Sequence, residues 1–210
     1  MRTLALIARH PTLDRDSFRN HYEQHHVPLA LPLLEGLTRY VRNHVVASSG
    51  GEPPFFDVMT EFTYRDSDAF EAVLARLGSP AGVAIAEDEL QFMDKARNVF
   101  FGVEERAGAG SEDPVGLEKW ALLGVRQSDE DRESCLTRME GLLQEDPALS
   151  VAWRHWASRA MGSEPPFDAV AFLWCEPGSL DDERLTHWAA RLGRGGVVLQ
   201  VKEARTPLSA

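Results

Sequence analysis

Apolar and polar positions in the first half of the chain follow two spacings, and each predicts a different element. Apolar runs that alternate with polar residues indicate strands, whereas apolar residues three or four positions apart indicate helices. The predicted elements are a strand over 3–9, a helix from Asp14 to His25, strands over 38–47 and 56–64, a helix from Ser67 to Leu77 and a strand over 97–104. Their order is β-α-β-β-α-β, that of a ferredoxin-like unit.

The second half of the chain shows the same order of patterns. Its predicted elements are a strand over 118–126, a helix over 129–144, strands over 150–158 and 167–174, a helix over 180–192 and a strand over 195–203. Between the halves, the segment Arg106–Pro114 has the composition of a linker. We therefore predict two domains, over residues 1–105 and 116–205.

Several sequence features recur in both halves in the same order. The matching pairs are Leu4–Ile7 with Trp120–Leu123, His44 with His155, Asp57 with Asp168, and Ala75–Gly78 with Ala190–Gly193. Each of these aspartates follows a segment that contains Pro-Pro-Phe and precedes an apolar run. Matches in one common order indicate two copies of one unit.

A four-stranded antiparallel sheet with both helices on one face leaves its other face to be covered. The predicted fold class is therefore α+β, with two ferredoxin-like units whose antiparallel sheets pack face to face as an intramolecular barrel. Such a pseudodimer is expected to be a monomer, and a homodimer through the helices stays open. The alternative is two independent domains on a flexible tether, each with a small core.

The composition, with 43% hydrophobic and 26% charged residues, is that of a soluble globular protein. The net charge of -11 argues against nucleic acid as a partner, because phosphate binding needs a basic surface. No run of about 20 apolar residues is present, so we expect no membrane partner and a cytoplasmic location. Cys135 and Cys175 show neither a disulfide framework nor zinc-ligand spacing.

The predicted helix near the N-terminus carries the main candidate for chemistry. Phe18, Tyr22 and His26 are four residues apart, so they share one helical face that ends in an imidazole. An imidazole beside an apolar pocket suits proton transfer, because its charge changes near neutral pH. The alternative is a helix C-cap, since Pro28 is expected to end the helix and His25 lies beside His26.

Two predicted strands add polar candidates. Alternation places Tyr40, Arg42 and His44 on one face of the second strand, and such a polar row lines either a wet cavity or an exposed edge. In the third strand, Glu61 is a carboxylate that could orient a histidine. The equal alternative for Glu61 is a salt bridge to Arg39, Arg42 or Arg97. His155 recurs at the position of His44, which favours a packing role for both.

A metal site and a cofactor are not predicted. His21 and His25 have the spacing of two ligands on a helix, but Glu23 does not complete a ligand set. Nothing beyond a histidine supports haem.

The candidate residues belong to a longer series in the first half. Its members are Phe18, Tyr22, His26 and Pro28, then Gly36, Leu37, Tyr40, Asn43 and His44, then Asp57, Glu61, Asp66 and Phe70, and last Asp88, Phe92 and Asp94. Over about residues 1–104 this series resembles the EthD family of the dimeric α+β barrel superfamily. The resemblance implies dimers through sheets and small-molecule functions, including auxiliary proteins of ether degradation and decarboxylase-, isomerase- or cyclase-like enzymes.

The second half departs from this series, because nothing corresponds to His26 and Pro28 and Phe172 stands where the first half has Glu61. We therefore expect one site, in the first half. The leading hypothesis is a cofactor-independent isomerase, cyclase, dehydratase or decarboxylase acting on a small apolar oxygenated compound, aromatic or polyketide-like. The alternatives are a non-catalytic binding or accessory protein and a cofactor-free monooxygenase.

Each residue of the expected site has a predicted role in this hypothesis. His26 would move the proton, and Tyr22 or Tyr40 would bind the developing oxyanion. The other predicted members of the site are His44 and Glu61 as further catalytic candidates and Phe18, Phe62, Phe92 and Asn43 as substrate-binding candidates.

Overall fold

The computed structural model describes residues 1–49, 53–111, 113–145, 151–161 and 164–208. Within it the chain divides into two compact units. The first consists of Met1–His44, Phe55–Phe100 and Glu203–Ala210, and the second of Val45–Pro54 and Phe101–Lys202. The domain boundaries at 105 and 116 stay a prediction. The start of the strand predicted over 150–158 lies partly outside the described residues.

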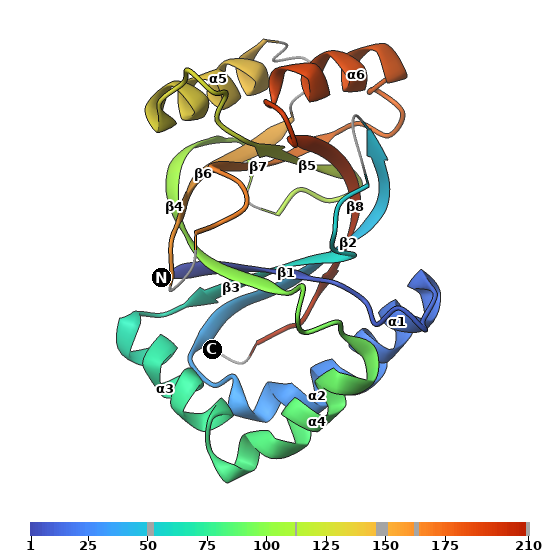
Figure 1. The fold of residues 1–210 in the computed structure, drawn as a ribbon, viewed down its shortest axis with the longest axis vertical. Helices are drawn as coiled ribbons and strands as arrows, with labels where there is room; N and C mark the ends of the chain where they lie inside the picture. Colours follow the sequence, from blue (N-terminus) through green and yellow to red (C-terminus); the bar gives the residue numbers. More distant parts are fainter. Residues whose placement is uncertain (50–52, 112, 146–150, 162–163, 209–210) are drawn as a thin grey trace. The chain divides into compact units, whose positions relative to one another are not determined.

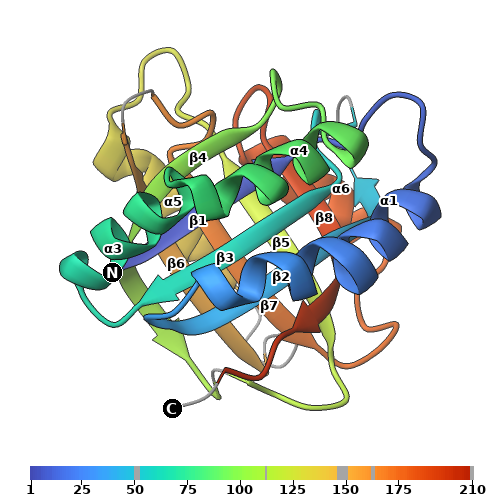
Figure 2. The same ribbon diagram turned by 90° about the horizontal axis from the view of Figure 1, so that it is seen from below.

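The first unit combines three antiparallel strands with a series of helices. Its elements are β1 (Arg2–Ile7), α1 (Arg15–His21), η1 (Tyr22–His26), α2 (Val27–Ala30), η2 (Leu31–Leu33), β2 (Leu37–Ser49), β3 (Val58–Tyr64), α3 (Ser67–Leu77), η3 (Pro80–Gly82), α4 (Val83–Phe92) and the start of β4 (Val99–Ala109). β3 pairs with both β1 and β2. The helices α1, α2, α3 and α4 lie on one face of these strands (Figure 2).

The first helical segment is longer than the sequence predicts. It begins where Asp14 accepts a hydrogen bond from the Ser17 backbone N–H at 2.7 Å. Pro28 does not end it, because α2 follows directly and η1 is a π-helix in which the Val27 N–H donates to the Tyr22 carbonyl. Such a wider turn re-pairs the backbone next to a proline, which has no N–H of its own.

A helix that the sequence analysis does not predict, α4, follows α3 through η3. Ser79 caps η3, and Pro80 occupies its first turn. The turn is tight at Gly82, where an added Cβ would lie 1.9 Å from the Leu77 carbonyl oxygen. This close approach requires a glycine.

Gly82→Ala is therefore expected to lower the free energy of unfolding by roughly 1–3 kcal/mol, because backbone must move to admit the methyl group. Urea unfolding measures the change. Gly141 is the matched control, since it lies in a helix with nothing within 4 Å of an added Cβ. Gly141→Ala is expected to raise the free energy of unfolding by roughly 0.5–1 kcal/mol. Equal effects of the two substitutions would contradict the close approach at Gly82.

The second unit is an antiparallel sheet with two helices. Its elements are β5 (Glu118–Gly124), α5 (Arg132–Gln144), β6 (Ala152–Arg159), β7 (Ala169–Cys175), α6 (Asp182–Arg191), most of β8 (Val197–Arg205) and the greater part of β4. The strand order is β8-β5-β7-β6-β4. The predicted linker is partly wrong, because β4 continues to Ala109 and pairs with β6.

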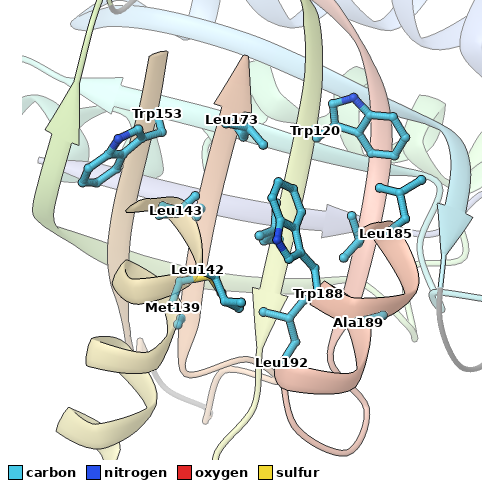
Figure 3. Packing of buried hydrophobic residues seen from close by; sticks show 14 of the residues in the cluster. Trp120, Met139, Leu142, Leu143, Trp153, Leu173, Leu185, Trp188, Ala189 and Leu192 are labelled. Carbon is cyan, nitrogen blue, oxygen red and sulfur yellow. The ribbon is translucent and has the colours of Figure 1, made fainter. Parts of the chain in front are cut away.

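Both helices of the second unit lie on one face of its sheet (Figure 1). Apolar side chains from α5, α6 and the strands fill the space between these layers, with Trp188 at 2% exposure among them (Figure 3). Burying large aromatic side chains gives this unit a substantial hydrophobic core.

Asp57 and Asp168 make the same contacts, each in its own unit. The Arg9 backbone N–H donates to Asp57 Oδ2 at 3.2 Å, and the Arg126 backbone N–H donates to Asp168 Oδ2 at 2.9 Å. Both arginine side chains also pair with the other oxygen of the same aspartate. In each unit the aspartate thus binds the arginine that follows the first strand, through both its backbone and its side chain.

The fold is of the α+β class with antiparallel sheets, as predicted. A tandem repeat of two ferredoxin-like units with their sheets face to face stays a prediction. Within the described residues no single helix is long and apolar enough to span a membrane, and only the bent pair Ser67–Leu77 and Pro80–Phe92 reaches that length and composition together.

Candidate functional site

The first unit contains a cavity of about 310 Å³ between its helices and its strands. Most lining side chains are apolar. The polar lining residues are Tyr22, His26, Tyr40, Tyr64, Glu89, Lys95 and Asn98. An apolar cavity with a few converging polar groups is the usual form of a small-molecule site.

His26 lies in the cavity wall and is 5% exposed. Its Nδ1 is 2.8 Å from Asp88 Oδ2, and Asp88 comes from α4. Burial lowers the pKa of His26, and the hydrogen bond and charge of Asp88 oppose this effect. A neutral His26 therefore donates its Nδ1 proton to Asp88, which leaves Nε2 as the basic nitrogen.

Tyr22 and Tyr40 are two of the three phenols that line the cavity. The Tyr22 hydroxyl is 3.0 Å from Thr60 Oγ1, and the ring centroids of Tyr22 and His26 are 5.4 Å apart. Burial raises the pKa of Tyr22 to about 12, although hydrogen bonds to Thr60 and Tyr40 oppose it. Burial also raises the pKa of Tyr40 well above its ordinary value. Both hydroxyls are therefore neutral donors at neutral pH.

The predicted aromatic residues divide into two groups. Phe62 lines the cavity and stacks on Tyr40, with ring centroids 5.1 Å apart. Phe18 and Phe92 are not among the cavity-lining residues, and both pack against Tyr22. They position the Tyr22 ring and do not contact the cavity.

His44 is also buried, but it does not line the cavity. Its Nε2 is 2.6 Å from Glu23 Oε1, and Arg42 pairs with the other oxygen of Glu23 at 2.5 Å. Burial opposes ionisation of Glu23, but the hydrogen bonds from His44 and Arg42 hold its pKa at about 2. His44 therefore belongs to a buried cluster with Glu23 and Arg42. Of the polar row of β2, only Tyr40 lines the cavity.

Glu61 and Asn43 lie on the opposite face of the sheet from His26. The Asn43 side-chain amide donates to Glu61 Oε1 at 2.9 Å, and neither residue lines the cavity. The expectation that Glu61 orients a histidine is corrected, because Asp88 is the carboxylate bound to His26. The sequence offered only a weak signal for this role, an acidic residue four positions before Phe92.

These features define a class of protein: an α+β fold with antiparallel sheets and an apolar, histidine-lined cavity. Residues 10–96 match the family model of the EthD domain, which confirms the predicted resemblance for this part of the chain. A comparison with curated proteins finds no match.

Solved structures share the fold. An anthrone oxidase-like protein superimposes with a TM-score of 0.58 at 12% sequence identity, over 97% of this chain and 92% of that one. At this identity the likeness concerns the fold alone. An EthD family protein from Bacillus halodurans C-125 is 26% identical over 48% of this chain and 93% of its own, with a TM-score of 0.37.

Proposed function

We propose that the first unit is a cofactor-independent enzyme that uses His26 to move a proton on a small, apolar, oxygenated compound. The substrate class is aromatic or polyketide-like, because the cavity is apolar apart from a few hydrogen-bonding groups. Isomerisation, cyclisation, dehydration and decarboxylation all proceed through the anion that such a proton transfer creates or consumes.

The proposal is carried by His26 in the wall of the cavity and by its buried hydrogen bond to Asp88. An aspartate that accepts a hydrogen bond from Nδ1–H fixes the tautomer of the imidazole. The lone pair is then on Nε2, the ring nitrogen that is not bound to the aspartate. Because burial lowers the pKa of His26, the ring is a free base at neutral pH. A positioned base of this kind contributes roughly 10²–10⁴-fold to a proton transfer.

The proposed step moves a proton from carbon to His26 and back. Nε2 of His26 takes a proton from a carbon next to a carbonyl, and the electron pair of that C–H bond moves into the carbonyl to form an enolate. Tyr22 or Tyr40 donates a hydrogen bond to the enolate oxygen. The imidazolium then returns the proton to carbon, or exchanges it with water first.

The mouth of the cavity carries charge. Lys95 and Glu89 both line it and form an ion pair, and their side chains are 42% and 26% exposed. Because most of the remaining lining is apolar, a substrate is expected to place its apolar part deeper in the cavity than this ion pair.

Proton exchange in D₂O tests the proposal with 2-tetralone, a small apolar ketone with acidic protons next to its carbonyl. Wild-type protein is expected to accelerate exchange at that carbon, measured by proton NMR. Ala5 lines the cavity, so Ala5→Phe is expected to fill it and to abolish both acceleration and binding. The control Ala75→Phe adds the same ring at an exposed position of α3 and is expected to retain both.

Saturable binding of 2-tetralone without exchange would contradict the enzymatic proposal and favour the binding or accessory protein. Oxygen uptake in the presence of a phenolic ligand, without proton exchange, would favour the cofactor-free monooxygenase. Acceleration that survives in Ala5→Phe would place the chemistry outside this cavity.

A further inference from the structure

We propose that His21, His25 and Asp88 form a binding site for a divalent transition-metal ion. The site lies on the outer side of α1, η1 and α4, and its ligand atoms all lie within 4.8 Å of one another. His21 Nε2 is 2.7 Å from Asp88 Oδ1, and His25 Nε2 is 3.4 Å from the same oxygen. The sequence analysis finds no carboxylate that completes a ligand set with these two histidines. In the structure Asp88, on the unpredicted helix α4, supplies it.

The three ligand atoms are close enough to surround one ion, with two distances of 2.7 and 3.4 Å and all three within 4.8 Å. Tetrahedral zinc binds nitrogen and oxygen at about 2.0–2.2 Å, which separates neighbouring ligand atoms by about 3.4 Å. The distance from His25 Nε2 to Asp88 Oδ1 already has this value. The shorter distance from His21 Nε2, 2.7 Å, must open to admit the ion.

Two of the three ligands are held in place before any ion binds. The Asp88 carboxylate is buried, and its other oxygen, Oδ2, bonds to His26. The His21 ring stacks on Phe92, with centroids 4.6 Å apart and an angle of 26° between the planes. Preoriented ligands reduce the entropy lost on binding, as partners behind the ligands do in known metal sites. His25 is 65% exposed and completes the set from the solvent side.

The approach to the site is open and polar. A surface depression at His21 and His25 is lined by polar side chains, namely Ser17, Asn20, Gln24 and Gln91, together with Leu13. Three protein ligands leave at least one coordination position, which water fills from this depression. The depression lies on the outer side of the helix, whereas His26 faces the cavity.

The ligand chemistry selects the class of ion. Two imidazoles with one carboxylate suit zinc, cobalt, nickel or copper, whereas magnesium and calcium prefer sites made of oxygen alone. Glu23 does not join the set, because it is paired with Arg42 and His44. The proposed site therefore differs from the combination of His21, His25 and Glu23, which the sequence analysis does not favour.

The ion and the cavity histidine would share one carboxylate. Asp88 offers Oδ1 to the depression and Oδ2 to His26. An ion on Oδ1 fixes the orientation of the carboxylate and, through it, that of the His26 ring. The proposal of metal binding itself does not rest on the proposed enzymatic function.

Titration of the full chain with zinc chloride, followed by calorimetry, tests the site, and cobalt(II) gives a visible spectrum that reports coordination. One ion is expected to bind with a tetrahedral-type cobalt spectrum. His25→Ala removes an exposed ligand without disturbing the His26–Asp88 pair, and it is expected to weaken binding at least tenfold.

The matched control is His187→Ala. His187 is 55% exposed and lies 3.6 Å from a Glu145 oxygen, so it has a carboxylate neighbour like His25. This substitution is expected to leave zinc affinity unchanged. Absence of zinc binding to the wild-type chain, undiminished binding in His25→Ala, or equal losses in the two variants would each overturn the proposal.

Discussion

Replacing His26 by glutamine is expected to slow proton exchange of 2-tetralone by roughly 10²–10⁴-fold, with little change in its affinity. Glutamine nearly preserves the size of the side chain and its capacity to donate to Asp88, but it has no basic nitrogen. The cavity and its apolar lining are retained, so the loss falls on the rate and not on binding. Proton NMR measures both quantities on the same sample.

Asp88 and Glu61 provide a matched comparison for this result. Both are buried carboxylates, at 3% and 2% exposure, but only Asp88 contacts His26. Asp88→Asn is expected to lower the exchange rate at unchanged affinity and to shift the NMR resonance of the His26 Nδ1 proton. Glu61→Gln, on the other face of β3, is expected to change neither. A full exchange rate in His26→Gln, or equal losses in the two carboxylate variants, would contradict the proposed role of the pair.

The elements that the sequence predicted well are those with local signals. The helix Ser67–Leu77 was predicted with the observed bounds, because Asp66 caps its start and Gly78 follows its end. The length of the first helical segment was wrong, since a proline is a local stop signal and the π-turn before Pro28 overrides it. α4 was missed because Asp88 interrupts its apolar face, and Asp88 is buried only through its contacts with histidines on another helix.

The candidate site was predictable in the same uneven way. Helical spacing placed Tyr22 and His26 on one buried face, and strand alternation placed Tyr40 apart from Asn43. Alternation does not say which face of a sheet the helices cover, so the sequence alone does not separate Glu61 from the histidines on the helix. Asp88 is 62 residues from His26 along the chain, and only the packing of α4 against η1 brings them together. Such a contact has no periodic signature.

His155 is expected to make the second unit unusually sensitive to acid. It is fully buried on β6, and among the described residues neither ring nitrogen has a hydrogen-bond partner. Burial lowers the pKa of His155 to about 4, and the positive charge of Arg106 adds to the effect. His44 and His155 occupy corresponding positions in the two halves, but their environments differ. His44 is paired with Glu23, whereas the His155 ring has no such partner among the described residues.

The lowered pKa fixes the direction of the pH dependence. The unfolded chain takes up a proton at His155 near its ordinary pKa of about 6.5, whereas the folded unit resists protonation down to about 4. Stability is therefore constant above about 6.5 and falls as the pH drops through this window. The full loss is about 3 kcal/mol, because each pKa unit corresponds to about 1.4 kcal/mol.

His155→Leu is expected to remove this contribution and to stabilise the unit at neutral pH as well, because a buried polar ring without partners is replaced by an apolar group. Urea unfolding at a series of pH values, followed by tryptophan fluorescence, measures the effect, since all five tryptophans lie in the second unit. His187→Leu, which removes an exposed histidine, is expected to keep the wild-type loss between neutral and acidic pH. An identical pH dependence in His155→Leu and wild type would show that His155 is not the group responsible.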